Sequence, residues 1–140
     1  MGETGGRNLA GANLPNAALR GEDLSGADLS GAILIQADMM ACDLSGANLK
    51  DANMNSANLT DADLSGANLT GTDLTRARLR GANFSGADLT GAILARTDLQ
   101  EADFRGAKID VENLDISGAR AWQEAKWDEH VFQALKAKFG

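Results

Sequence analysis

The sequence has little of what most enzymes and metalloproteins use for chemistry. Among its 140 residues there are one cysteine, one histidine and no tyrosine, and aromatic residues make up 4%. A single cysteine excludes an internal disulfide and suits a reducing compartment. The only histidine, His130, stands near the C-terminus, outside the repeated segment described below. The repeat therefore contains no Ser/His or Cys/His pair for nucleophilic catalysis.

Motifs for cofactors and membranes are also missing. The sequence has no Cys/His cluster with metal-ligand spacing, no Walker motif and no dinucleotide-binding glycine motif. No apolar run approaches 18 residues, and the opening MGETGG does not read as a signal peptide. A net charge of −7 opposes direct nucleic-acid or anionic-membrane binding. We expect no enzymatic activity, no cofactor, no metal and no membrane contact. We expect a cytoplasmic location, with an organellar, periplasmic or lumenal mature form as the alternative.

What the sequence does have is a five-residue repeat. The phrase DLSGA and its variants recur with a large apolar residue at every fifth position, from Leu9 to Leu114, without insertion or deletion. The 22 central residues are 17 Leu, two Met, two Phe and one Ile. The residue two places earlier is Ala in 16 of the 22 pentapeptides, because only a small side chain fits beside the large one in a narrow core. Cys42 stands at one such position and is predicted to be a buried filler.

A period of five residues fits neither regular element. On an α-helix, steps of five rotate by about 140°, and on a strand successive leucines alternate between faces. The chain must therefore turn once per pentapeptide and point the same residue inward each time. A second period of 20 residues indicates four pentapeptides per coil, and it is clearest in one row of glycines: Gly26, Gly46, Gly66, Gly86 and Gly106. The pattern predicts an all-β solenoid of square cross-section with about five and a half coils.

The run of A(D/N)LXX pentapeptides resembles the pentapeptide-repeat family, and the resemblance covers Arg7 to Ile116. It implies a right-handed quadrilateral β-helix with one short strand or bridge and one turn per pentapeptide. It implies two kinds of function. Some members are interaction modules of unassigned role, whereas quinolone-resistance members bind a type II topoisomerase (gyrase) by imitating DNA in shape and charge. Some members also dimerise through a C-terminal helix.

Three segments follow from this pattern. We expect a flexible lead-in at 1–6, the repeat β-helix at 7–116 and a C-terminal helical cap at 117–140. Asp128 is the predicted N-cap of the tail helix, with Trp127 packing on Phe132 as a hydrophobic staple. The tail either covers the last coil of a monomer or forms a homodimer, and the expected contacts are Trp122, Trp127, Phe132, Leu135 and Phe139.

The turns and the outward residues are where pentapeptides differ. The glycine rows predict turns with positive φ, and a tighter turn without positive φ is predicted where Gln36, Arg76 or Arg96 replaces glycine. An acidic ladder is predicted, whose stacked charges need counterions, shifted protonation or a basic partner; it comprises Asp23, Asp43, Asp63 and Asp103. Two further candidate contact groups are outward isoleucines and arginines: Ile33, Ile35 and Ile93, and Arg76, Arg78, Arg80 and Arg96.

The sequence therefore favours a non-enzymatic scaffold or protein-interaction module with an unknown protein partner. The alternative is a DNA-mimicking binder of gyrase, for which the charge has the right sign: residues 7–116 hold 16 acidic and 9 basic residues. The arginine group and the absence of a projecting loop weaken that alternative. A third hypothesis is that the chain is a fragment or idealised specimen of the family.

Overall fold

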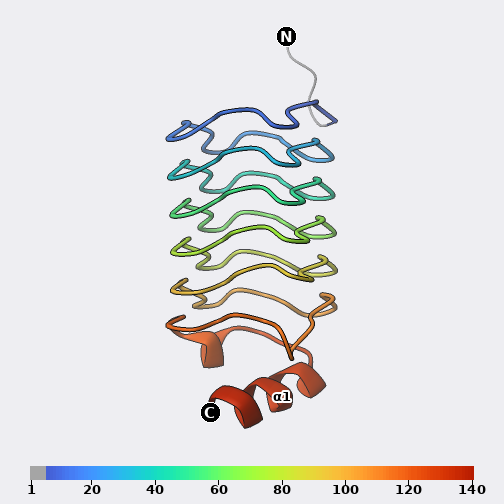
Figure 1. Cartoon of the computed structure of the whole chain (residues 1–140), viewed down its shortest axis with the longest axis vertical. Helices are drawn as coiled ribbons and strands as arrows, with labels where there is room; N and C mark the ends of the chain where they lie inside the picture. Colours follow the sequence, from blue (N-terminus) through green and yellow to red (C-terminus); the bar gives the residue numbers. More distant parts are fainter. Residues whose placement is uncertain (1–5) are drawn as a thin grey trace.

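The computed structural model describes residues 6–140, so the lead-in expected at 1–6 lies outside the described residues except for Gly6. The chain winds into a stack of similar coils, with two helical segments at one end (Figure 1). Within 6–140 the helices are the 3₁₀-helix η1, Trp122–Glu124, and the α-helix α1, Glu129–Phe139. The extended parts of the coils are single-residue parallel bridges.

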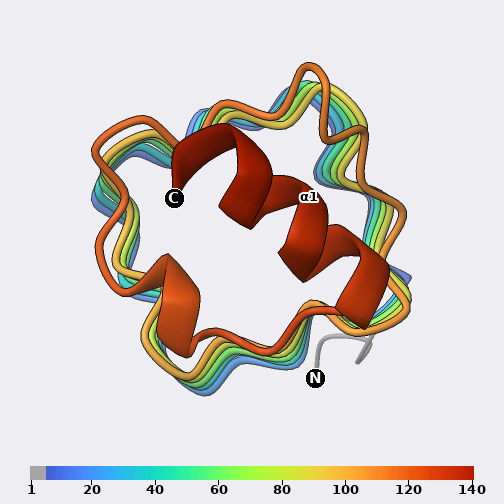
Figure 2. The same ribbon diagram turned by 90° about the horizontal axis from the view of Figure 1, so that it is seen from below.

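The coils are joined by a regular ladder of these bridges. From Asn8, which pairs with Asp28, every bridge as far as the one between Asp88 and Lys108 joins residues 20 apart, which is the length of four pentapeptides. The Leu9 N–H donates to the Asp28 carbonyl at 2.7 Å, and the Asp28 N–H donates to the Arg7 carbonyl at 2.8 Å. Seen along the stack, the coils superpose in a four-sided outline (Figure 2).

The core is the column of central residues inside this outline. From Leu24 to Phe104 these side chains are at most 1% exposed, and the small residues beside them are equally buried. Burying each large apolar side chain is worth roughly 1.5–3 kcal/mol against exposure. Leu9, Leu14 and Leu19 lie at the N-terminal end of the described stack and are only partly buried.

The turns are alike at every corner, which contradicts the tighter turn predicted for corners without glycine. Gln36, Arg76 and Arg96 have φ of +57°, +62° and +57°, close to the +64° of Gly26. The reason lies in the inter-coil bonds. The Arg76 N–H donates to the Ala95 carbonyl at 2.9 Å, just as the Gly26 N–H donates to Ser45 at 2.8 Å. The stack imposes the left-handed conformation whichever side chain is present, although non-glycine residues adopt it at a cost of roughly 1–2 kcal/mol.

The predicted register is wrong near the C-terminus. We expected it to run unbroken to Leu114 and to fail after Ile116, but the last bridges join Ile93 to Asp115, Asp98 to Arg120 and Asp103 to Lys126. These pairs are 22, 22 and 23 residues apart. An extra turn at 111–113 lengthens the coil, with the Asn113 N–H donating to the Asp110 carbonyl at 3.2 Å. The wall of the solenoid thus continues past 116 to Lys126.

The aromatic residues of the tail complete the core, but not as the predicted staple. Trp127 stacks on Phe104 at 4.4 Å between ring centroids, and its Nε1–H donates to the Trp122 carbonyl at 2.8 Å. The ring that meets Phe132 is that of Trp122, at 6.1 Å. Asp128 is the N-cap residue of α1, yet its carboxylate makes no capping bond. That carboxylate instead accepts the Gly106 N–H at 2.9 Å, because the chain before α1 still follows the last coil.

Helix α1 lies across the open end of the last coil (Figure 2). Leu135 is fully buried and Val131 is 4% exposed, whereas Phe132 is partly buried and Phe139 is 39% exposed. The buried face of α1 is therefore centred on Val131 and Leu135, and Phe139, which was predicted to belong to it, does not. The Lys138 ammonium donates to the Val111 and Glu112 carbonyls at 3.0 and 2.6 Å, which ties the end of α1 to the extra turn.

Leu135→Ala should destabilise the fold by about 2–5 kcal/mol, because it leaves a cavity under α1. Phe139→Ala, on the exposed end of the same helix, should change the free energy of unfolding by less than about 1 kcal/mol. Urea unfolding of both variants beside the unmodified chain measures the difference. Equal losses in the two variants would mean that α1 does not bury the face described above.

Candidate interaction surface

Outward side chains form columns, because each coil repeats the one before it. Neighbouring residues of a column are about 4.8 Å apart along the stack, as in any β-ladder. We name three columns by their residues. The acidic column is Asp23, Asp43, Asp63, Asn83, Asp103 and Lys126. The face column is Ala18, Asp38, Asn58, Arg78, Asp98 and Arg120. The corner column is Asn16, Gln36, Ser56, Arg76, Arg96 and Gly118.

The carboxylates of the acidic column accept hydrogen bonds from the residue two places later in the chain. The Asp23 carboxylate accepts both the Ser25 hydroxyl at 2.6 Å and the Ser25 N–H at 3.0 Å, and Asp43 and Asp63 do the same with their own serines. These hydrogen bonds favour the ionised form and lower the pKa of Asp23. The pKa of Asp103 is lowered by the hydrogen bond from Arg105. Protonation of Asp23 and Asp103 is therefore made harder, which is opposite to the shift that stacked charges would cause.

The outward isoleucines do not form a continuous apolar surface. Ile33 and Ile93 are each 37% exposed and share one column, but Asn53 and Asp73 stand between them. Ile35 follows on the next turn and is half-buried. Separate apolar side chains of this kind are normal on protein surfaces.

The four predicted arginines do lie together, and they are exposed. Arg76 and Arg96 are neighbours in the corner column, Arg78 is in the face column, and Arg80 follows it on the next turn. We call these four residues the arginine cluster. Within residues 6–140 no salt bridge or side-chain hydrogen bond engages any of the four.

Other arginines of the chain are paired. Arg20 donates to the Asp38 carboxylate at 3.0 Å, Arg105 to Asp103 at 2.8 Å, and Arg120 lies 3.5 Å from the Asp98 carboxylate. Each of these pairs neutralises a charge within the chain. The arginine cluster therefore concentrates unpaired positive charge at one place in the described part of the chain, although the chain as a whole is acidic.

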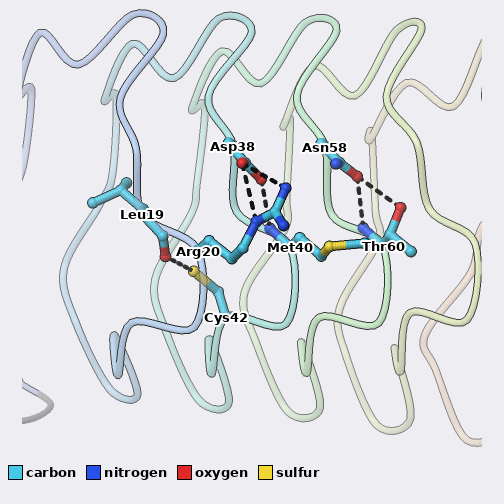
Figure 3. Close-up of polar contacts among 7 residues, drawn as sticks. All are labelled: Leu19, Arg20, Asp38, Met40, Cys42, Asn58 and Thr60. Carbon is cyan, nitrogen blue, oxygen red and sulfur yellow. Dashed lines mark hydrogen bonds and ion pairs between the residues drawn. The ribbon is translucent and has the colours of Figure 1, made fainter.

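A polar groove of about 480 Å³ adjoins the arginine cluster between the corner and face columns. Its lining is Asn16, Arg20, Gln36, Ala37, Asp38, Ser56, Asn58 and Arg78. Figure 3 shows part of the groove lining: Arg20 reaches Asp38, and the Asn58 side-chain oxygen Oδ1 accepts from the Thr60 N–H and hydroxyl at 3.1 and 2.6 Å. Apart from Arg78, these residues were not among the predicted contacts. The available signal was the corner series from Asn16 to Arg96, which holds no glycine.

Cys42 lies behind this wall as a buried filler, as predicted. It is 1% exposed, and its thiol donates to the Leu19 carbonyl at 2.8 Å (Figure 3). Burial disfavours the thiolate and raises the pKa of Cys42 to about 11. The thiol is thus a packing group at neutral pH.

Family models match the chain as pentapeptide repeats, in eight copies, over 8–46, 42–81, 72–109 and 82–120. These segments cover most of the chain. The chain belongs to the pentapeptide-repeat family. Membership implies a right-handed quadrilateral β-helix, which agrees with the ladder of bridges, and no catalytic family is indicated.

Solved structures of other pentapeptide-repeat proteins are similar. One from Nostoc Pcc 7120 is 28% identical with a TM-score of 0.61, and the match covers 87% of this chain and 85% of that one. One from the cyanobacterium Cyanothece 51142 is 32% identical with a TM-score of 0.35 and coverage of 89% and 90%. One from the thylakoid lumen of Arabidopsis thaliana is 40% identical with a TM-score of 0.36 and coverage of 72% and 62%. No curated protein matches the chain. Neither helix within 6–140 is long and apolar enough to span a membrane.

Removing a hydroxyl should raise the pKa of its aspartate partner. The Ser30 hydroxyl donates to Asp28 at 2.6 Å and is the largest cause of the lowered pKa of that carboxyl. Ionised Asp28 therefore contributes stability above its usual pKa of 3.8, and this contribution is lost as pH falls through the lower folded pKa. Ser30→Ala should move the pKa of Asp28 up toward 3.8 in a carboxyl NMR titration. Ser85→Ala, beside the non-titrating Asn83, is the matched control. An unchanged Asp28 pKa in Ser30→Ala would contradict the assignment.

Proposed function

We propose that the chain is a non-enzymatic scaffold that binds a protein partner through its outward columns. The observation that carries the proposal is the contrast between a uniform interior and unlike outer columns. Inside, the central positions are large apolar residues throughout, and from Leu24 to Phe104 they are sealed from water. Outside, one column combines carboxylates with serines, while the corner column changes from amides to arginines. A solenoid that repeats its core and varies its surface suits recognition over an extended face.

The stack also supports a scaffold role because it holds outward side chains in place. Each coil is bonded to the next through backbone groups, and the Asp and Asn side chains before the central residues bond the backbone two residues ahead, as Asp28 does to the Ser30 N–H at 3.0 Å. A partner therefore meets a surface that needs little ordering, which lowers the entropic cost of binding. The buried thiol of Cys42 suits a reducing compartment such as the cytoplasm. As part of the proposal we keep a monomer with α1 as its lid.

Affinity capture followed by rebinding of purified candidates tests this role. We expect a captured protein to rebind the full chain, and to lose affinity by about tenfold or more when the column it contacts is altered. Two column variants serve the purpose: Asp43→Asn with Asp63→Asn keeps the turn hydrogen bonds but removes charge, and Arg78→Gln with Arg80→Gln removes positive charge. Lys50→Gln with Lys136→Gln changes two exposed lysines elsewhere as the matched control. If no purified candidate rebinds the full chain, the scaffold role is wrong. A partner that binds all variants alike contacts neither of the two altered surfaces.

Binding to gyrase is the second candidate, and the net charge of −7 is the observation that favours it. Two features of the structure oppose it. The acidic column ends in Lys126 and is interrupted by Asn83, and the arginine cluster adds unpaired positive charge to the wall. An imitation of DNA requires a continuous negative face. We therefore rank this function below a scaffold for another partner.

A supercoiling assay decides between the two candidates. At micromolar chain concentration we expect gyrase to supercoil relaxed plasmid at its usual rate, with no inhibition and no protection from a quinolone. The variant that carries both Arg78→Gln and Arg80→Gln provides the comparison, because removing positive charge should strengthen any imitation of DNA. If the unmodified chain inhibits gyrase and the variant inhibits it more strongly, gyrase binding is the better supported function.

A further inference from the structure

We infer that the arginine cluster, together with the adjoining polar groove, is the docking site for an acidic, extended segment of a partner protein. The inference rests on the proposed scaffold function and names the chemistry of the partner. Its basis is the juxtaposition of four unpaired guanidinium groups with a groove of about 480 Å³ that shares Arg78 with them.

The first step of the argument is charge. Arg76, Arg78, Arg80 and Arg96 are all exposed and none has a carboxylate partner among residues 6–140. Like charges this close repel one another, so an anionic ligand is favoured over an empty surface. The fork of a guanidinium group also matches a carboxylate with two parallel hydrogen bonds. The ligand chemistry that fits is therefore a set of carboxylates.

The second step is spacing. Arg76, Arg78 and Arg80 alternate with Ala77 and Leu79, which are 1% and 0% exposed. Arg76 lies in the turn before the bridge residue Arg78 and Arg80 lies in the turn after it, so the three arginines span one side of the coil. A partner segment in the extended conformation that runs along this side presents alternate side chains to it about 6.6 Å apart. Acidic residues at every second position of such a segment can thus meet the arginines.

The third step is the groove, in which the Asp38 carboxylate is paired with Arg20 and several neutral side chains offer hydrogen-bonding groups. The carboxamides of Asn16 and Gln36 have no partner within the described part of the chain, and the Asn58 amide nitrogen is also free because only its oxygen is used by Thr60. Amide side chains both donate and accept hydrogen bonds. They can therefore bond the peptide groups of a segment that continues from Arg78 into the groove.

Two other anionic partners fit less well. Duplex DNA spreads its charge over a long face, and the chain has a net charge of −7, so a long polyanion is repelled outside the cluster. A second copy of this chain offers its acidic column, but those carboxylates are already bonded to their own serines or to Arg105, as at Asp23 and Asp103. A short acidic segment with free carboxylates meets neither obstacle.

Fluorescence anisotropy with a labelled peptide of alternating glutamate and serine tests the site. The unmodified full chain should bind this peptide, and binding should weaken as salt is raised. Arg78→Gln with Arg80→Gln should weaken it by about tenfold or more, whereas Lys50→Gln with Lys136→Gln, which changes the net charge equally, should stay within about twofold. Gln36→Trp, which places a bulky side chain in the groove and leaves every arginine in place, should also weaken binding. A peptide with glutamine in place of glutamate should not bind.

Several outcomes would overturn the inference. These are no binding of the acidic peptide, equal losses in the arginine and lysine variants, full binding by Gln36→Trp, or tighter binding of a duplex DNA probe. Sedimentation that shows a dimer abolished by Arg78→Gln with Arg80→Gln would assign the cluster to a second copy instead. These failures are separate from failure of the scaffold role: a purified partner that rebinds the arginine variant at full strength uses another column.

Discussion

The constraint on which this structure depends is the set of backbone hydrogen bonds that each pentapeptide makes to the coils on either side of it. The N–H of a central residue such as Leu29 reaches the carbonyl of Asn48 at 2.7 Å, and the N–H of Asp28 reaches back to Arg7 at 2.8 Å. Since buried backbone groups must be paired, each regular coil has to match the length and the corners of the coil beside it. The leucine column, the left-handed corners and the outward columns all follow from that match.

The repeat, its four-pentapeptide spacing and its apolar core were readable from the sequence because each of them recurs many times. The features that were predicted wrongly from the sequence are those that occur only once or that depend on contacts with the neighbouring coil. Arg76 and Arg96 adopt positive φ because the coil below holds their N–H groups, not because of their own preference. The register after Lys108 shifts because a turn between Asp110 and Asn113 adds residues, and nothing in the pattern of leucines marks that addition.

The residues of the outer surface were predictable from the sequence, but their pKa shifts and the groove between them were not. The aspartates were found from the repeat, yet the pKa of Asp23, Asp28 and Asp88 is lowered by the Ser or Thr two residues later, whose hydroxyl and N–H stabilise the carboxylate. The arginines were found as well, whereas the groove beside them was not. A groove depends on how far side chains from several coils project, as those of Gln36, Ser56 and Asn58 do, and periodicity contains no information on that.

The separation of core from surface explains how one chain can combine an acidic composition with a positive docking site. Central and small residues fill the interior, so outward positions make few contacts that the fold requires, and substitutions there change stability by about 0.5 kcal/mol or less. Exceptions are the Asp and Asn side chains that bond the backbone two residues ahead. Arg78 stands at one of these positions, between Asn58 and Asp98 in the face column, and forgoes that bond. Ile33 and Ile93 stand at equivalent positions and also lack that bond, so its absence alone does not mark a contact. What distinguishes Arg78 is its unpaired guanidinium group at the edge of the groove, and the proposed docking site rests on that charge.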